Sequence, residues 1–188
     1  MAAVESTMLA LGTQAPGFSL PDPDEKLYTL EDGAAAYLIM FICNHCPFVQ
    51  HVRQELAQLG SDYISQNVSI FAINSNDVER YAGDSPANMK REAQTWGYSF
   101  PYLVDADQSV AKAYAAACTP DFYLFGADKA LVYRGQLDNS RPANDQPVDG
   151  RDLRAALDAV IAGTTVSAQQ IPSIGCSIKW KPGNEPEY

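Results

Sequence analysis

An uninterrupted apolar run, Tyr37 to Ile42, restricts the fold more than any other part of the sequence. A continuous run of this kind is typical of a strand that is buried on both faces of a sheet. Directly after it, apolar residues recur at helical spacing from Phe48 to Leu59, and Pro47 suits the first turn of a helix. The segment therefore predicts a central strand that leads at once into a helix.

The rest of the chain continues this alternation of strand and helix patterns. Ser85 followed by Pro86 predicts a helix start, and Gly97 predicts the end of that helix. The expected elements, in order, are strands 27–30 and 37–42, a helix from 47, strand 68–73, helix 85–97, strand 100–104, helix 110–117, an antiparallel hairpin of strands 122–125 and 131–134, and helix 151–162. This order, with right-handed crossovers in its parallel half, predicts the α/β class.

Length and composition predict one domain that spans residues 1–188. With 188 residues, of which 46% are hydrophobic, the chain can bury a sizeable core. Prolines gather near both ends, so residues 12–22 are expected to be extended chain and turns. Residues 164–188 are expected to form an extended tail that packs over the body.

The charge balance argues against two classes of partner. The chain carries 13 basic and 23 acidic residues, a net charge of -10, which repels phosphate backbones and anionic lipid surfaces. Nucleic-acid and membrane partners are therefore not expected. The longest apolar stretch, Ala34 to Cys43, is about half of the roughly 20 residues in a membrane helix, and residues 1–11 lack the basic start of a secretory signal. These features predict a cytoplasmic protein, in which the four cysteines would not form structural bridges.

Two cysteines, Cys43 and Cys46, lie where the central strand gives way to the helix. Free N–H groups and the positive end of the helix dipole stabilise a thiolate at such a position and lower its pKa below about 8.5. We therefore expect Cys43, at the helix N-terminus, to be the nucleophile and the more exposed thiol. The spacing lets Cys46 resolve a mixed disulfide on Cys43 across one turn. Asn44 and His45, between them, are expected to tune the pair, His45 by a positive charge or a hydrogen bond to the Cys43 sulfur.

Two other interpretations of the cysteine pair compete with redox chemistry. Zinc would need two further ligands, and the sequence offers only His51, Cys118 and Cys176, without a second closely spaced pair. Buried cysteines can also act simply as small hydrophobic residues. The position at a helix start favours redox chemistry, so neither a metal nor an organic cofactor is expected.

Longer motifs around these residues resemble a known family. Cys43-x-x-Cys46-Pro47 after an apolar strand, together with Thr119-Pro120 before the hairpin, resembles the thioredoxin-like fold. The opening at 12–22, GxxAPxFxLPD, is similar to that of the alkyl hydroperoxide reductase and thiol-specific antioxidant branch. More narrowly, CNHCPFV at 43–49 and IGCSIKWKPGNEP at 174–186 resemble a bacterial group of thioredoxin family proteins that are described as thiol-disulfide oxidoreductases.

The resemblance implies a central mixed β-sheet flanked by helices, and a thiol-disulfide oxidoreductase that exchanges electrons with protein partners. It also implies a cis Thr119–Pro120 bond in a loop beside the cysteines, where the Thr119 backbone can pair with a bound substrate strand. Two positions depart from thioredoxins: Ile42 stands in place of Trp, and Tyr37 in place of a buried Asp that accepts a proton. Asp121 could substitute for that carboxylate, but we favour a solvated turn residue.

Two further functions remain as alternatives. In the first, a thiol peroxidase, the peroxidatic cysteine follows a Pro-x-x-x-Thr-x-x-Cys pattern. Ala36 and Met40 occupy these positions before Cys43, and Ile39 and Cys43 occupy them before Cys46, so neither register supplies the proline or the threonine. The second alternative is an interaction module of thioredoxin-like fold, whose cysteines are merely retained and whose tail docks a partner.

The remaining cysteines have less defined expectations. Cys118 follows three alanines and lies close to Pro120, which favours a packed thiol over a reactive one. Cys176, in the tail motif, is either a third redox thiol or a residue that fills a groove. His51 has no expected role.

The position of His45 also predicts the redox potential of the cysteine pair. Protein disulfide isomerase and DsbA, at about -180 and -120 mV, resemble this chain in carrying His just before the second cysteine, whereas thioredoxin lies near -270 mV. We therefore expect a potential between roughly -240 and -150 mV.

Overall fold

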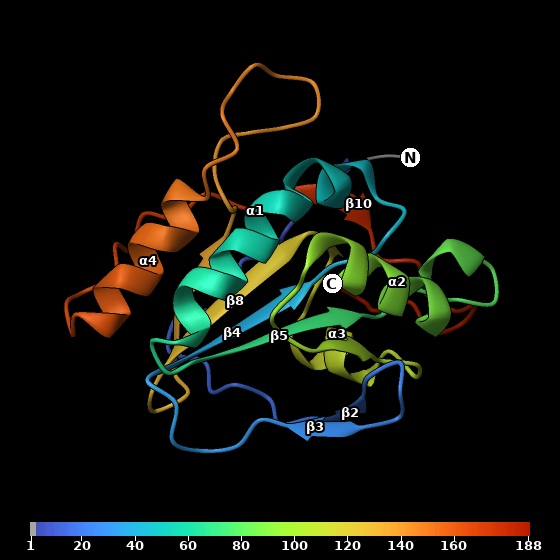
Figure 1. Ribbon diagram of the computed structural model, residues 1–188, viewed down its shortest axis with the longest axis horizontal. Coiled ribbons are helices and arrows are strands. Elements are labelled where there is room, and N and C mark those ends of the chain that lie inside the picture. Colours follow the sequence, from blue (N-terminus) through green and yellow to red (C-terminus); the bar gives the residue numbers. More distant parts are fainter. Residues whose placement is uncertain (1–2) are drawn as a thin grey trace.

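The computed structural model describes residues 3–188 and has a five-stranded mixed sheet at its centre (Figure 1). The strand order is β6-β5-β4-β8-β9. The first three of these strands are parallel, whereas β8 and β9 run antiparallel to their neighbours. The bounds are β4 (Ala36–Phe41), β5 (Val68–Asn74), β6 (Tyr102–Val104), β8 (Asp121–Gly126) and β9 (Leu131–Gly135). The expected α/β class with a central mixed sheet is confirmed.

β4 lies at the centre of the sheet because all of its side chains are apolar or aromatic. All six residues are fully buried. Alternate side chains enter two separate cores, since Leu38 and Met40 pack on one face and Tyr37 and Ile39 on the other. Burying a large apolar side chain contributes roughly 1.5–3 kcal/mol, so this strand is a major source of stability.

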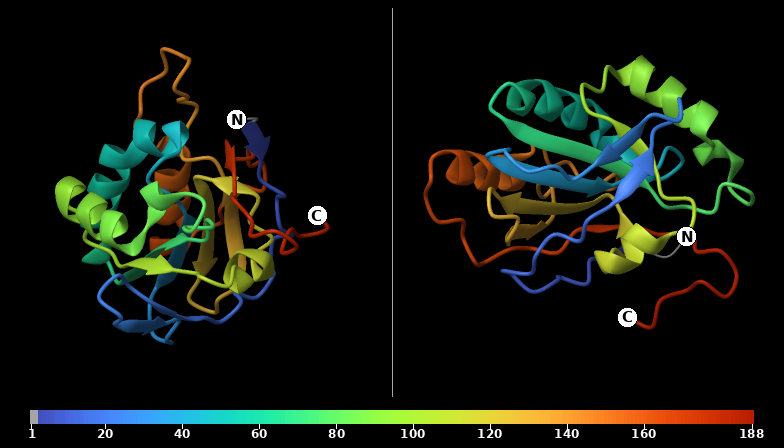
Figure 2. Two further views of the ribbon diagram at one scale, coloured as in Figure 1. Left: turned by 90° about the vertical axis from the view of Figure 1, so that its right-hand side faces the viewer. Right: turned by 90° about the horizontal axis from the view of Figure 1, so that it is seen from below.

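Helices cover both faces of the sheet (Figure 2). One face carries α1 (Pro47–Ile64), α2 (Pro86–Trp96) and α4 (Arg151–Ile161), and the other carries α3 (Ser109–Ala113) with the hairpin of β2 (Ser19–Pro21) and β3 (Leu27–Thr29). α2 starts and stops as predicted, because Gly97 adopts the left-handed conformation that closes a helix. Within residues 3–188, none of the helices has both the length and the apolar character needed to cross a membrane.

A second sheet, which the sequence did not predict, joins the tail to the middle of the chain. It has the order β1-β10-β7, with β1 (Ala3–Glu5), β10 (Ile174–Ser177) and β7 (Cys118–Thr119). Strands of two to four residues carry too little alternation to be read from sequence, and their partners here lie far apart along the chain. Gly175 permits the close pairing, since a Cβ at this position would collide with the backbone of Thr119.

The rest of the tail runs extended along the side of the body (Figure 2). The Lys112 ammonium donates to the side-chain oxygen of Asn184 at 2.5 Å. The Tyr188 hydroxyl lies 3.2 Å from the carbonyl oxygen of Ala116. These contacts hold the final residues against α3 and the segment that follows it.

Candidate active site

Cys43 and Cys46 lie between the end of β4 and the start of α1, where the sequence placed them. α1, however, begins at Pro47, and its N-cap is Cys46. Proline sets this start because it lacks an N–H donor and is tolerated in the first turn. The expectation that Cys43 caps the helix is therefore wrong. Cys46 occupies that position instead.

Thr119 contacts both cysteines from the loop that precedes β8. The Cys43 Sγ and the Thr119 Oγ1 are 3.3 Å apart, and the Cys46 thiol donates to the Thr119 carbonyl oxygen at 3.1 Å. The Thr119–Pro120 peptide bond is cis. Both the bond and the position of its loop beside the cysteine pair are thus as the family resemblance implies.

The two thiols are almost equally buried, which differs from the expected contrast in exposure. Cys43 is 1% exposed and Cys46 is 0% exposed. Asn44 and His45, the residues between them, are only partly buried. A partner must therefore displace part of the cover over the sulfur atoms to react with either of them.

The environment favours the thiolate at Cys46 rather than at Cys43. Donation from the Cys43 thiol is the main cause that lowers the pKa of Cys46, assisted by hydrogen bonds from Cys176, Thr119 and the Val49 backbone. The same contact with Cys46, together with burial and the nearby Asp84 carboxylate, raises the pKa of Cys43. These pKa directions are opposite to the expected order of acidity.

Asp84, which no sequence pattern indicated, organises the turn that carries the two cysteines. Its side chain is fully buried at the end of the short 3-10 helix η1 (Ala82–Asp84). One carboxylate oxygen accepts from the backbone N–H groups of Asn44 and His45, at 2.8 and 3.2 Å. The other accepts from His45 Nδ1 at 2.6 Å and from the Asn76 amide at 2.8 Å. The carboxylate thereby fixes both residues between the cysteines.

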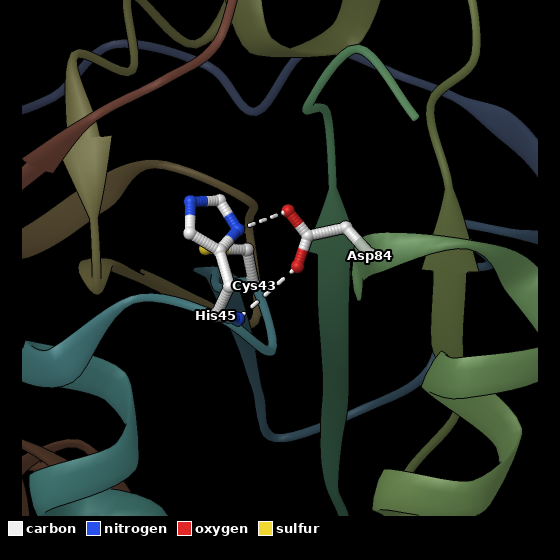
Figure 3. A group of neighbouring side chains, drawn as sticks. All are labelled: Cys43, His45 and Asp84. Atoms are coloured by element: carbon white, nitrogen blue, oxygen red, sulfur yellow. Dashed lines mark hydrogen bonds and ion pairs between the residues drawn. The ribbon is translucent and has the colours of Figure 1, made fainter. Parts of the chain in front are cut away.

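Figure 3 shows that Cys43, His45 and Asp84 form a compact group. Their potential ligand atoms all lie within 4.8 Å of one another, so these residues could hold a metal ion. The group supplies three donors, one fewer than a closed zinc site has, and the Asp84 carboxylate already accepts four hydrogen bonds. The arrangement fits an ion pair that supports the turn better than a metal centre. His45 also stacks on Tyr81, with ring centroids 5.5 Å apart.

Asp121 is neither a solvated turn residue nor a proton acceptor for the cysteine pair. It is fully buried, and it accepts a hydrogen bond from the Tyr123 hydroxyl at 2.9 Å. Asp121 lies next to Phe41 in the register of β4 and β8, and both Phe41 and Tyr123 belong to the core on the face away from the cysteines. Burial raises its pKa to about 7.

This raised pKa predicts a measurable effect on stability. The folded state holds a proton on Asp121 that the unfolded state has released, so the free energy of unfolding should fall from about pH 4 to pH 7. Asn cannot release a proton in this range, so Asp121→Asn should not show this decrease. Relative to the parent, its free energy of unfolding should therefore rise by at most about 4 kcal/mol between pH 4 and pH 8. Urea unfolding across this range tests it, with Asp145→Asn, at an exposed position, as the control. A parallel pH dependence of parent and Asp121→Asn would contradict the assignment.

The other two cysteines flank the pair from the second sheet. Cys118 is fully buried in β7, and its thiol faces the Pro120 carbonyl oxygen at 3.6 Å. Burial raises the pKa of Cys118 far above its usual range, as expected for a packed thiol. Cys176, in β10, belongs to the same buried cluster as Cys43 and Cys46 and contributes to the lowered pKa of Cys46. All four cysteines are free thiols.

A groove opens beside Pro120, between α1 and the segment after β9. Its lining combines apolar, polar and charged side chains: Phe48, His51, Val52, Pro120, Phe122, Gln136, Leu137, Asp138, Ser140, Arg141, Pro142, Ser173 and Ile174. The His51 ring nitrogen Nε2 is buried there and has no hydrogen-bond partner among residues 3–188. His51, which had no expected role, thus lines a surface next to the cis-proline loop.

A closely spaced cysteine pair at a strand-to-helix junction, beside a cis-proline loop, defines a redoxin-type site on a thioredoxin-like fold. The sequence model of the AhpC/TSA family matches residues 11–134, and the chain belongs to this family. The match ends within β9, so it includes both cysteines of the pair and the Thr119–Pro120 loop but not the tail.

Three related proteins extend this comparison. A crystal structure of an uncharacterized conserved protein from Geobacillus kaustophilus is 59% identical, covers 97% of this chain and 98% of its own, and has a TM-score of 0.95. The thiol-disulfide oxidoreductase ResA of Geobacillus thermodenitrificans is 28% identical over 124 residues, which are 64% of this chain and 66% of that protein. A thioredoxin domain of a Bacteroides vulgatus thiol-disulfide oxidoreductase is 15% identical, covers 68% of this chain and 89% of its own, and has a TM-score of 0.58.

Proposed function

We propose that this protein is a thiol-disulfide oxidoreductase that cycles Cys43 and Cys46 between dithiol and disulfide with protein partners. The observation that carries the proposal is the placement of two buried thiols, three residues apart, against the same residue of the cis-proline loop, since Thr119 Oγ1 contacts Cys43 and the Thr119 carbonyl oxygen contacts Cys46. The similarity to a ResA protein that bears this activity in its name supports it. The chain spans 66% of that relative, so the activity is inferred from the site first.

Cys46, rather than Cys43, is the nucleophile in this proposal. Its thiolate attacks one sulfur of a partner disulfide, a mixed disulfide forms, and the other partner sulfur leaves and takes up a proton. The Cys43 sulfur then attacks Cys46, loses its proton, and releases the first partner sulfur. Two electrons pass to the partner, and a dithiol partner reverses the steps. The chain's own thiols suffice, so no cofactor or metal takes part.

The Thr119–Pro120 loop and the groove beside it form the surface for the partner. Thr119 lies next to both sulfur atoms, and Pro120 lines the groove. A protein segment that reacts with Cys46 would displace the cover of the thiols and extend along this loop. The net charge of -10 opposes nucleic-acid partners.

Catalysed reduction of a protein disulfide tests the proposal. The parent protein should accelerate the reduction of insulin by dithiothreitol, whereas its consumption of hydrogen peroxide should be slow. Rapid peroxide consumption without disulfide exchange would favour the peroxidase alternative. Stable binding of a partner without either reaction would favour the interaction module.

His45→Ala should lower the redox potential of the pair. The His45 ring pairs with Asp84 next to the Cys43 sulfur, so its removal leaves the carboxylate facing that sulfur and disfavours the thiolate form of the reduced pair. A loss of about 1.4 kcal/mol in the stability of the reduced pair corresponds to a shift of about -30 mV in its redox potential. Equilibration of both proteins with glutathione buffers measures the difference. Equal potentials would show that His45 is only a spacer, and a potential of the parent at or below thioredoxin's would contradict the oxidising poise.

Two further expectations belong to this proposal. We propose that the chain belongs to the narrower bacterial group described above, because the motifs at 43–49 and 174–186 both lie at the site and contribute the reactive pair and β10. A cytoplasmic location would keep all four thiols in the free form in which they occur here. Fractionation of the source cells, followed by immunoblotting, tests the location.

A further inference from the structure

A third thiol, that of Cys176, lies in the same buried cluster as the proposed nucleophile, Cys46. Cys176 belongs to β10, and the register of β10 and β7 places it opposite Thr119, the residue that contacts both Cys43 and Cys46. Cys43, Cys46 and Cys176 belong to one buried cluster, and both neighbouring thiols contribute to the lowered pKa of Cys46. Cys46 therefore has two possible disulfide partners.

The backbone around Cys176 is fixed on both sides. Before it, the Ser173 hydroxyl donates to the Gly135 carbonyl oxygen at 2.6 Å, and Gly175 allows close contact with Thr119. After it, the backbone N–H of Lys179 donates to the side-chain oxygen of Asn76 at 2.8 Å. Cys176 itself is 4% exposed. These contacts keep its thiol at Cys46 rather than in solvent.

We propose that Cys176 is a second resolving thiol for Cys46, so that the site contains a three-cysteine relay. The proposal rests on the proposed function, because it requires Cys46 to carry the disulfide. In the relay step, the Cys176 sulfur attacks Cys46 in the Cys43–Cys46 disulfide. The Cys46–Cys176 bond forms, the Cys43–Cys46 bond breaks, and the proton of Cys176 passes to the departing Cys43 sulfur. The exchange is internal and consumes no further oxidant.

Cys176 can resolve an external mixed disulfide in the same way. The attack releases the partner's sulfur as a thiol and ties the N-terminus of α1 to β10. Burial raises the pKa of Cys176 to about 12, so little of it is ionised at neutral pH, and its attack relies on its contact with Cys46. Cys43 is the expected first partner, and Cys176 takes over when Cys43 is absent or already exchanged.

Tryptic mapping of the oxidised Cys43→Ser variant tests the relay. Oxidised glutathione first forms a mixed disulfide on Cys46, and Cys176 should then displace glutathione. Trypsin separates the two cysteines into peptides 27–53 and 155–179, so the relay disulfide joins these peptides. We expect the joined species in at least half of the molecules. Cys43→Ser/Cys118→Ser is the matched control that should still join them, and Cys43→Ser/Cys176→Ser should keep glutathione on Cys46.

Retention of glutathione on Cys46 in Cys43→Ser, at the level of Cys43→Ser/Cys176→Ser, would overturn the relay. A second measurement guards against misfolding of the variants. The parent, oxidised and quenched in acid, should contain a minor joined species that is absent from Cys176→Ser, and its absence from the parent would also overturn the relay. If the parent forms the Cys43–Cys46 disulfide but never the joined peptides, the relay fails and the proposed function stands. If the parent forms neither, the proposed function fails.

Discussion

Cys46→Ser should lower the rate of disulfide exchange by at least about 1,000-fold, because it removes the attacking thiolate. In the insulin assay its rate should equal that of dithiothreitol alone. The structure singles out Cys46 because it is the N-cap residue of α1 and because its surroundings, with Cys43 as the main cause, lower its pKa. A serine hydroxyl at this position is a far weaker nucleophile at neutral pH.

Cys43→Ser is the matched variant for this prediction. It should also lose turnover of insulin, but it should keep the first step and form a mixed disulfide on Cys46. Mass spectrometry after reaction with oxidised glutathione distinguishes the two variants. If Cys46→Ser forms a mixed disulfide on Cys43 as fast as the parent reacts, then Cys43 is the nucleophile and the roles proposed here are wrong.

Asp84→Ala should destabilise the protein by several kcal/mol, because each buried donor that is left without its acceptor costs about 1–3 kcal/mol. The substitution leaves the backbone N–H groups of Asn44 and His45, and the amide of Asn76, without their acceptor. The same turn carries both cysteines, so the variant should also exchange disulfides more slowly. Urea unfolding under reducing conditions measures the stability.

Asp84→Asn separates charge from shape at this position. It keeps an acceptor oxygen for the backbone N–H groups but removes the negative charge next to His45 and Cys43, so we expect a smaller loss of stability than in Asp84→Ala. A loss below about 1 kcal/mol in Asp84→Ala would show that the turn does not depend on this carboxylate.

The central strand and the place of the cysteine pair were predictable because their signals are local. The apolar run at 37–42 and the proline at 47 lie within one short segment, and each is strong by itself. The boundary between strand and helix was harder to place. Moving the helix start by a few residues exchanges the roles of Cys43 and Cys46, and the structure places it at Pro47.

The parts of the site that were not predictable come from distant segments. Asp84 reaches His45 from a position 39 residues further along the chain, after β5 has crossed the sheet. The short pairing of β10 with β7 brings Cys176 to the site. Strands this short show no hydrophobic periodicity that could predict the pairing from the sequence. The environment of Asp121 depends on which face of β8 its side chain occupies, and the adjacent proline suggested a turn instead of a buried strand.

The most direct test of the account is a redox titration of the parent protein in glutathione buffers, read by the mass of peptide 27–53, which contains both Cys43 and Cys46. The account predicts a reversible two-electron transition in which this peptide loses two hydrogens, with a midpoint between roughly -240 and -150 mV. A peptide that stays fully reduced, or that carries only glutathione throughout the titration, would contradict the claim that Cys43 and Cys46 form a redox couple.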